Sequence, residues 1–395
     1  MPVRTLDDTP DLQGRRVLVR ADFNVALNEG RIEDDTRIRR TLPTIETLKS
    51  RGAVVVLCSH LGRPDGSVKE ELRMDPVARR LEELLGSRVH KLDDCVGEEV
   101  KAALEEREPG DIVLLENTRF HPGETRNDEA FSRQLAELAE IYVHDAFGAA
   151  HRAHASTEGV GHHLPAFAGQ LMSREIEALE EVRDSPRHPF VVLLGGAKVS
   201  GKIGVIERFL EVADTVLVGG AMANTFLAAG GIEVEESLVD EDSISEARRL
   251  AERAEDKLVL PVDAVVAAEP DPDAERKTAP VNAVPRGWHI LDIGPETVTS
   301  FEERVAEART VLWNGPLGAF EWEPFAEGTF SMVRALARSD ATTIAGGGET
   351  VAAITHLGLA ERFTHVSTGG GAFLEFMEGK ELPGIRILKR SGRSG

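Results

Sequence analysis

A series of short β-branched runs constrains the fold of this 395-residue chain more than any other feature. Each run is followed by Gly, Asn, Asp or His and then by a helical pattern, which is typical of βα units around a buried parallel sheet. Eleven strands are too many for one ordinary sheet, so the pattern predicts two. The runs are 16–23, 53–60, 111–118 and 141–147 in the first half, and 189–196, 214–220, 257–263, 288–294, 309–315, 342–348 and 364–371 in the second half.

An amphipathic segment separates the two series. Between residues 171 and 189 the apolar side chains fall at helical spacing, and Pro186 and Pro189 mark its end. The apolar positions are Leu171, Met172, Ile176, Leu179 and Val182. The sequence therefore predicts a helix joining two doubly wound α/β (Rossmann-like) domains.

Composition and charge narrow the possible functions. The net charge is −22, and only ten of the 46 basic residues are lysines, which argues against non-specific binding to nucleic acid or anionic lipid. Such an acidic, halophilic-type surface suits high salt, and a simply acidic protein is the alternative. Two cysteines, Cys58 and Cys95, indicate buried thiols in a reducing compartment. Without an apolar run of about 20 residues or a signal peptide, a cytoplasmic location is expected.

Arginines follow the strands of the first half. In open α/β sheets ligands bind beyond the carboxyl ends of the strands, and guanidinium groups bind phosphate and carboxylate bidentately. Their clustering in so acidic a chain is sensible if an anion lies between them. Asp22 and Asn24 could orient a hydroxyl and a carboxylate of that anion, or could form an Asx turn after the first strand. The arginines are Arg20, Arg37, Arg63, Arg119 and Arg152.

The stretch VHDAFGAAHRAHAST (143–157) places three histidines around Arg152. A metal-dependent hydrolase is one interpretation, but the spacing of His144, His151 and His154 matches no common zinc motif. The position at a strand end favours Arg152 as an anion ligand with His151 and His154 beside it. His144 lies inside the strand and is expected to be structural.

Glycine-rich turns follow the strands of the second half. Such turns let backbone N–H groups and a helix N-terminus approach phosphate oxygens, so several in succession predict a nucleotide site. Gly196–Lys202 fits GxxxxGK, but Ile203 follows, so the hydroxyl that holds Mg²⁺ in a P-loop is absent. The chain has no GxGxxG, HRD or DFG, which disfavours a Rossmann dinucleotide site and a protein kinase. Lys198 and Lys202 stand near a predicted helix start.

Taken in order, these segments resemble the phosphoglycerate kinase family over essentially the whole chain. The matching stretches are VRADFNV, DDTRIRRTLPTI, SHLGRPDG, LLENTRF, HDAFGAAHRAH, LLGGAKVSGKI, LVGGAMANTF, LWNGPLGAFEWEPF, GGGET and VSTGGGAFLEFMEGKELPGI. The resemblance implies reversible phosphoryl transfer between 1,3-bisphosphoglycerate and ADP, giving 3-phosphoglycerate and ATP, with Mg²⁺. It also implies a monomer that acts on small molecules. Because the two ligand sets lie on separate domains, a hinge motion is predicted to bring them together, and the acidic charge predicts neither nucleic acid nor membrane as partner.

The resemblance implies three sets of site residues. The glycerate substrate set is Arg20, Asp22, Phe23, Asn24, Arg37, His60, Leu61, Gly62, Arg63, Arg119, His151, Arg152 and His154. The nucleotide set is Lys198, Lys202, Gly219, Gly220, Asn314, Glu321 at the ribose, Gly346, Gly347, Gly348, Glu349 as metal ligand, and Thr350. The set nearest the transferred group is Arg37, Lys198, Gly348 and Gly371, the last at a helix start within 368–371.

Three positions depart from the family's commonest pattern. Glu349 stands where Asp usually binds the metal, Gly201 where Asp is frequent, and Ala26 where Pro follows FNV. A non-catalytic nucleotide-binding relative is the other alternative, which the intact Lys198 and Arg37 oppose. The expected domains are 1–169 for the glycerate substrate, 170–188 as hinge helix, 189–377 for the nucleotide, and 378–395 returning to the first domain.

Overall fold

The computed structural model describes residues 2–389, which divide into two compact units. Unit 1 comprises the chain up to Glu177 together with the stretch from Glu381 onward, and unit 2 is Ala178–Lys380. Each unit contains a six-stranded parallel sheet. The prediction of two doubly wound parallel-sheet domains is confirmed.

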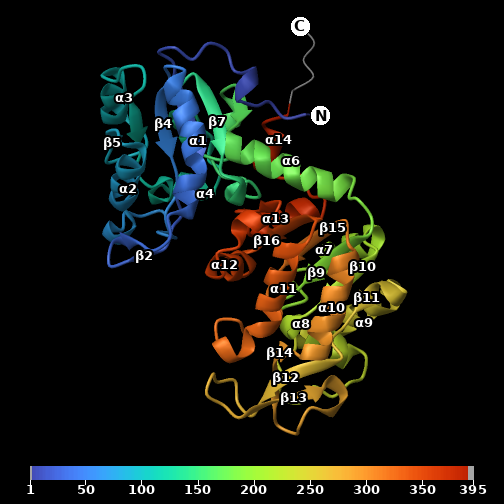
Figure 1. The fold of residues 1–395 in the computed structure, drawn as a ribbon. Coiled ribbons are helices and arrows are strands. Elements are labelled where there is room, and N and C mark those ends of the chain that lie inside the picture. The colour runs from blue at the N-terminus through green and yellow to red at the C-terminus, as the bar shows by residue number, and fades with distance from the viewer. Residues whose placement is uncertain (1, 390–395) are drawn as a thin grey trace. The chain divides into compact units, whose positions relative to one another are not determined.

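The sheet of unit 1 has the strand order β5-β6-β4-β1-β7-β8. Its strands are β1 (Arg16–Ala21), β4 (Val54–Cys58), β5 (Val89–Lys91), β6 (Ile112–Leu114), β7 (Ile141–Asp145) and β8 (Ala166–Ala168), and a hairpin of β2 (Leu27–Asn28) and β3 (Arg31–Ile32) follows β1. The helices are α1 (Thr36–Ser50), α2 (Asp75–Leu85), α3 (Glu98–Glu105), α4 (Pro122–Thr125), α5 (Glu129–Ala136) and α14 (Pro383–Arg386). Figure 1 shows α1 alongside β4. Strand order reverses at β1, between β4 and β7, so the carboxyl end of β1 is where a ligand is expected.

The large sheet of unit 2 has the order β11-β10-β9-β15-β16-β17. Its strands are β9 (Phe190–Leu194), β10 (Thr215–Val218), β11 (Leu258–Val259), β15 (Thr310–Asn314), β16 (Thr342–Gly346) and β17 (His365–Val366). The helices are α7 (Ile203–Val212), α8 (Gly220–Ala229), α9 (Ile244–Ala254), α10 (Pro295–Glu307), α11 (Glu327–Arg338), α12 (Gly348–His356) and α13 (Gly371–Met377). Order reverses between β9 and β15, which places the loops after these two strands at the switch point.

One predicted strand belongs to a different sheet. The run 288–294 forms β14 (His289–Ile293), but β14 pairs antiparallel with β12 (Asp263–Ala267) in a three-stranded sheet β13-β12-β14. Figure 1 shows β12 and β13 (Arg276–Pro280) together in yellow and orange. The expectation of one parallel series was wrong here, because four of the five residues of β13 are exposed and an exposed strand face is typical of antiparallel sheets.

The predicted joining segment forms α6 (Gln170–Asp184), and its five apolar positions are all buried. The boundary between the units falls within this helix, between Glu177 and Ala178. After Glu381 the chain packs in unit 1: Gly384 N donates to Ala150 O (2.9 Å), and Arg4 N donates to Leu388 O (2.9 Å). Residues 390–395 of the expected returning segment lie outside the described residues. Within residues 2–389 no helix is long and apolar enough to cross a bilayer.

Candidate active site

Arginines converge at the carboxyl edge of the unit 1 sheet. Burial, followed by the positive charges of Arg152, Arg20 and Arg63, lowers the pKa of Arg119 to about 10 against the opposing effect of Glu124. Guanidinium groups repel one another, so this arrangement is stabilised when an anion lies among them. Four of the five strand-end arginines of the sequence analysis are therefore close enough in the structure for their charges to interact.

Arg20 is held below the surface of this cluster. Its side chain is 1% exposed, and its Nε donates to Ser156 Oγ (2.8 Å) while one terminal nitrogen donates to His60 Nδ1 (2.9 Å). A guanidinium fixed by these bonds contributes charge at a defined position without rearrangement.

The loops after β1 and β4 are tied together by polar side chains. Asp22 Oδ1 accepts from Asn24 N (3.3 Å), which is the Asx turn of the second alternative, while Asp22 Oδ2 accepts from Arg37 (2.8 Å). Asn24 Oδ1 accepts from Gly62 N (2.9 Å), and Arg119 donates to Gly62 O (2.8 Å). Four predicted residues thus take part in these hydrogen bonds, with Arg37 half-exposed beside them.

The remaining predicted substrate residues differ in exposure. Phe23 and Leu61 are 0% and 1% exposed and belong to the core, so only their backbone can reach a ligand. Arg63 is exposed, and its charge reaches Arg119. Arg152 Nε donates to His151 Nε2 (3.2 Å), so these neighbours form a pair at the same edge.

His60 and His154, which lie near the arginines, are neutral at pH 7. Burial, followed by the charge of Arg20 and its neighbours, lowers the pKa of His60 well below 6.5. Burial and the same arginines lower the pKa of His154 to about 4. His144 is buried in β7, where its Nδ1 accepts from Ala146 N (3.4 Å), as expected for a structural residue. Positive charge that repels a proton also repels a metal cation, so the geometry opposes a metal site on this stretch.

A pH titration of stability tests this electrostatic interpretation for His154. The unfolded chain takes up the proton near pH 6.5 and the folded chain only near pH 4, so the wild-type free energy of unfolding falls as the pH drops through this window. His154→Gln lacks this contribution. The difference in the free energy of unfolding between wild type and His154→Gln should therefore shrink or reverse as the pH falls toward 4. Urea unfolding followed by circular dichroism measures it.

An exposed histidine outside the arginine cluster provides the control. His163→Gln should retain the wild-type pH dependence. Parallel curves for wild type and His154→Gln between pH 6.5 and 4 would contradict the proposed environment of His154.

Two buried residues of this site were missed from the sequence. Glu124, which is 0% exposed, accepts from Ser156 N (3.0 Å) and from Ser156 Oγ (2.6 Å). Its carboxylate thereby positions the hydroxyl that receives Arg20 Nε. The two residues lie 32 positions apart, and one Glu among many carries no local signal.

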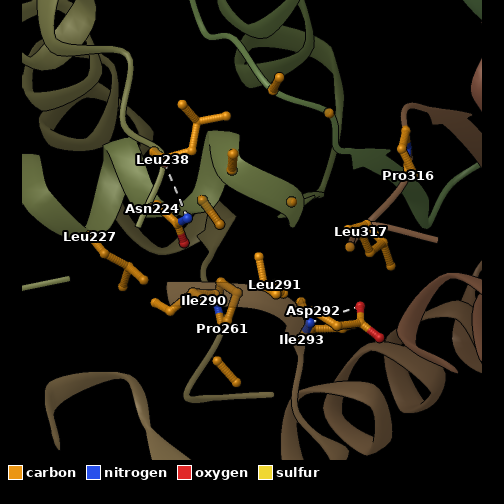
Figure 2. A pocket seen from close by; sticks show the side chains of 18 of the residues that line it. Asn224, Leu227, Leu238, Pro261, Ile290, Leu291, Asp292, Ile293, Pro316 and Leu317 are labelled. Carbon is orange, nitrogen blue, oxygen red and sulfur yellow. Dashed lines mark hydrogen bonds between the residues drawn. The ribbon is translucent and has the colours of Figure 1, made fainter. Parts of the chain in front are cut away.

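Unit 2 contains a cavity of about 220 Å³ beside its switch point. The glycine-rich turns form part of its wall through Gly196 and Gly220, and Glu321 and Glu349 also line it. Figure 2 shows the other walls, where Asn224 is directed toward Leu238, whose carbonyl accepts from its amide (3.2 Å). The apolar lining includes Leu227, Leu238, Pro261, Ile290, Leu291 and Leu317. An apolar slot next to exposed backbone N–H groups suits a flat base joined to phosphates.

Three predicted nucleotide residues brace the loops around the cavity. Lys202 Nζ donates to Gly195 O (2.6 Å), and burial lowers its pKa to about 8 although Glu349 raises it. Asn314 Nδ2 donates to Gly346 O (2.8 Å), and Thr350 Oγ1 accepts from Gly315 N (2.7 Å). Asn314 and Thr350 are buried, so in this structure their side chains fix the loops rather than face solvent.

The two predicted helix starts, those of α12 and α13, follow strands β16 and β17 of the unit 2 sheet. α12 begins at Gly348 after Gly347, whose φ is +96°, and α13 begins at Gly371 after Gly370, whose φ is +49°. Gly219 directly precedes α8, and a Cβ there would lie 2.6 Å from Leu317. Backbone N–H groups at helix starts are donors for phosphate oxygens.

Close backbone approach predicts a large effect at Gly315. Its φ is +96°, and a Cβ there would lie 2.3 Å from Gly195 O, so Gly315→Ala should destabilise unit 2 by about 2 kcal/mol or more. The matched control is Gly201→Ala, where no heavy atom lies within 4 Å and the change should stay within about 0.5 kcal/mol. All three tryptophans lie in unit 2, so urea unfolding followed by tryptophan fluorescence measures it. Equal stability of the two variants would contradict this account.

Comparison with known proteins decides the family. The model of the family described as Phosphoglycerate kinase matches residues 6–380. The chain belongs to the phosphoglycerate kinase family. It is 57% identical to a phosphoglycerate kinase of Moorella thermoacetica over 97% of this chain and 98% of the relative. It is 58% identical to one of Rubrobacter xylanophilus over 96% of each chain.

Solved structures of phosphoglycerate kinases have the same fold. The structure from Coxiella burnetii is 41% identical with a TM-score of 0.89, covering 98% of this chain and 99% of that one. The structure from Pyrococcus horikoshii is 34% identical with a TM-score of 0.87, covering 98% of each. The family expected from the sequence motifs, and an enzyme of the kinase class, are therefore confirmed.

Phosphoglycerate kinases use a nucleotide substrate with Mg²⁺, and the residues of this site fit that ion. Glu349 is exposed in the first turn of α12 and lines the cavity, so its carboxylate is accessible to an ion there. Mg²⁺ takes one or two carboxylates together with substrate phosphates and water. Glu349 would therefore hold the ion in this chain, in place of the family's usual Asp.

Proposed function

We propose that this chain transfers a phosphoryl group reversibly between 1,3-bisphosphoglycerate and ADP, giving 3-phosphoglycerate and ATP. Family membership supports the activity. The observation that carries the substrate assignment is the convergence of four arginines at the switch point of unit 1, because the glycerate substrate bears phosphate and carboxylate groups. The cavity of unit 2 supports nucleotide binding.

The reaction requires no general base. In the direction that consumes ATP, the acceptor is a carboxylate, which is already ionised at neutral pH because its ordinary pKa is about 4. Neutral His60 and His154 are then hydrogen-bonding groups rather than proton acceptors. What the enzyme must supply is alignment of the two oxygens and positive charge around the group in transit.

The proposed charge donors come from both units. Arg37 approaches from unit 1, and Lys198 and the N–H groups at Gly348 and Gly371 approach from unit 2. α12 has nine residues and α13 has seven, so Gly348 opens the helix with the larger dipole. When bound, Mg²⁺ neutralises charge on the nucleotide phosphates, and Glu349 would hold it.

Because the two sets of donors lie in different units, we propose that the units close on their substrates by bending within 170–188. Closure aligns the reacting oxygens and excludes water. Small-angle scattering should show a smaller radius of gyration with 3-phosphoglycerate and nucleotide together than with nucleotide alone. An unchanged radius with both substrates would contradict closure.

A coupled assay of ATP formation from 1,3-bisphosphoglycerate and ADP tests the function directly. We expect turnover that depends on ADP and Mg²⁺ in a monomeric enzyme acting on small molecules in the cytoplasm. Binding without turnover would support a non-catalytic relative, and hydrolysis without nucleotide would support the metal-dependent hydrolase. Either result would contradict the proposal.

A further inference from the structure

A cluster of three different metal-ligating side chains lies in unit 1 and takes no part in the proposed reaction. Ligand atoms of Asp94, Cys95 and His121 lie within 4.8 Å of one another. Among residues 2–389 no other group of three or more His, Cys, Asp or Glu side chains is close enough together to hold an ion. We propose that Asp94, Cys95 and His121 form a binding site for a divalent transition-metal ion of the Zn²⁺ class.

The donor set selects the class of metal. Sulfur and imidazole nitrogen with a single carboxylate oxygen suit Zn²⁺ or Co²⁺, whereas Mg²⁺ and Ca²⁺ require oxygen ligands. Bond lengths of about 2.0–2.3 Å place tetrahedral ligand atoms about 3.3–3.8 Å apart, so the cluster needs shifts of about 1 Å. A solvent molecule supplies the fourth ligand, because Asp94 is 53% exposed and His121 31% exposed.

The two segments that supply the ligands are already held in place. Asp94 Oδ1 accepts from Cys95 N (2.6 Å) and lies 2.6 Å from His121 Nε2, which leaves Asp94 Oδ2 for a metal. The ring of His121 stacks on Phe131 with centroids 4.9 Å apart, which fixes its plane. Cys95 is 0% exposed, so its sulfur approaches from the protein side of the site.

Charge around the cluster favours a cation. Asp94, Glu116 and Glu124 all act electrostatically on Cys95. The neighbouring Lys91 is engaged by Glu116 (2.7 Å) and Asp93 (3.1 Å). On binding, the sulfur–hydrogen bond of Cys95 breaks and its proton leaves to solvent. His121 Nε2 donates to Asp94 Oδ1 in the free site, so its proton also leaves to solvent while Nδ1 takes one up, and Nε2 then coordinates the ion.

The site would connect to the substrate cluster through the chain. His121 directly follows the 3₁₀ turn Thr118–Phe120, which carries Arg119, whereas Asp94 and Cys95 follow β5. A bound ion therefore fastens the turn that carries Arg119 to the loop after β5. This inference does not depend on the proposed kinase reaction, because its readouts are spectroscopic.

Titration of the full chain with Co²⁺ tests the site. We expect sulfur-to-cobalt charge-transfer absorption, which Co²⁺ on an oxygen ligand such as Glu349 does not give, and we expect Zn²⁺ to displace it. Cys95→Ser should abolish the absorption. The matched control Cys58→Ser, a buried thiol in β4, should retain it.

Two further variants keep the test decisive if Cys95→Ser does not fold. His121→Gln and Asp94→Asn change partly exposed side chains, and each should weaken Co²⁺ binding at least about tenfold. Zn²⁺ should also raise the thermal unfolding midpoint of wild type but not that of His121→Gln. Absence of charge-transfer absorption in wild type, its persistence in Cys95→Ser, or its loss in Cys58→Ser would overturn the proposal.

Discussion

Lys198→Ala is expected to lower kcat by about 10²–10³-fold with a smaller change in nucleotide affinity. Lys198 is exposed in the loop between β9 and α7, where it can follow a moving phosphoryl group. It lines a pocket of about 280 Å³ with Asp240, Glu241 and Asp242. The N–H of Ser200 and, more weakly, the charge of Lys198 hold the pKa of Asp240 below its ordinary value. Steady-state kinetics with both substrates varied separates kcat from KM.

Two variants define what Lys198 contributes. Lys198→Arg keeps the charge but not the compact ammonium, so its loss should be intermediate. Lys380→Ala removes an exposed lysine of unit 2 that pairs with Glu378, and it should leave kcat unchanged. An effect of Lys198→Ala on KM alone would reassign Lys198 to ground-state binding, and wild-type kcat would exclude the proposed role.

The buried parallel strands could be predicted because burial on both faces leaves a continuous apolar run. β1 and β4 are almost entirely buried, and both were expected. β5 (VHK) buries one residue of three and β8 (AFA) is mostly alanine, so neither gives the aliphatic run that marked the equally short β6 (IVL). β13 buries one residue of five, so its sequence RKTAP resembles a loop, and without it β14 could not be recognised as antiparallel.

Charged and glycine positions of the site could be predicted, but its apolar walls could not. A single arginine usually forms a surface salt bridge, so Arg119 and Arg152 stood out only as members of a set that shares its position at strand ends. Leu238 and Ile290 cannot be told from core residues by sequence, because only the packing of α8 against β14 leaves space between them. Asn314 is predicted to contact a nucleotide, and in the structure its amide donates to Gly346 O. That bond joins β15 to β16 and has no local sequence signal.

Arg37→Ala is the second variant with a large expected effect, a fall in kcat/KM for the glycerate substrate of about 10²-fold or more. Arg37 occupies the first turn of α1, where a cation opposes the helix dipole, and no acidic residue stands in that turn. Its terminal nitrogen lies 2.8 Å from Asp22 Oδ2, and its side chain is 40% exposed against 9% for Asp22. The helix dipole disfavours a cation at this position, and the Arg37 side chain is partly open to solvent. Both features are expected if Arg37 binds an incoming anion. Arg39→Ala is the matched control, since Arg39 is on the same helix, 53% exposed, and pairs with Asp35.

A double-mutant cycle with Asp22→Asn separates substrate binding from a purely structural ion pair. Without Arg37, the carboxylate of Asp22 remains at the anion site and repels the substrate. Arg37→Ala with Asp22→Asn should therefore be less impaired than the sum of the two single variants predicts, with a coupling in kcat/KM of about tenfold. A structural ion pair would produce its coupling in the free energy of unfolding and leave the kinetic effects additive. Additive kinetics, or wild-type kcat/KM in Arg37→Ala, would contradict the role of Arg37 in holding the anion.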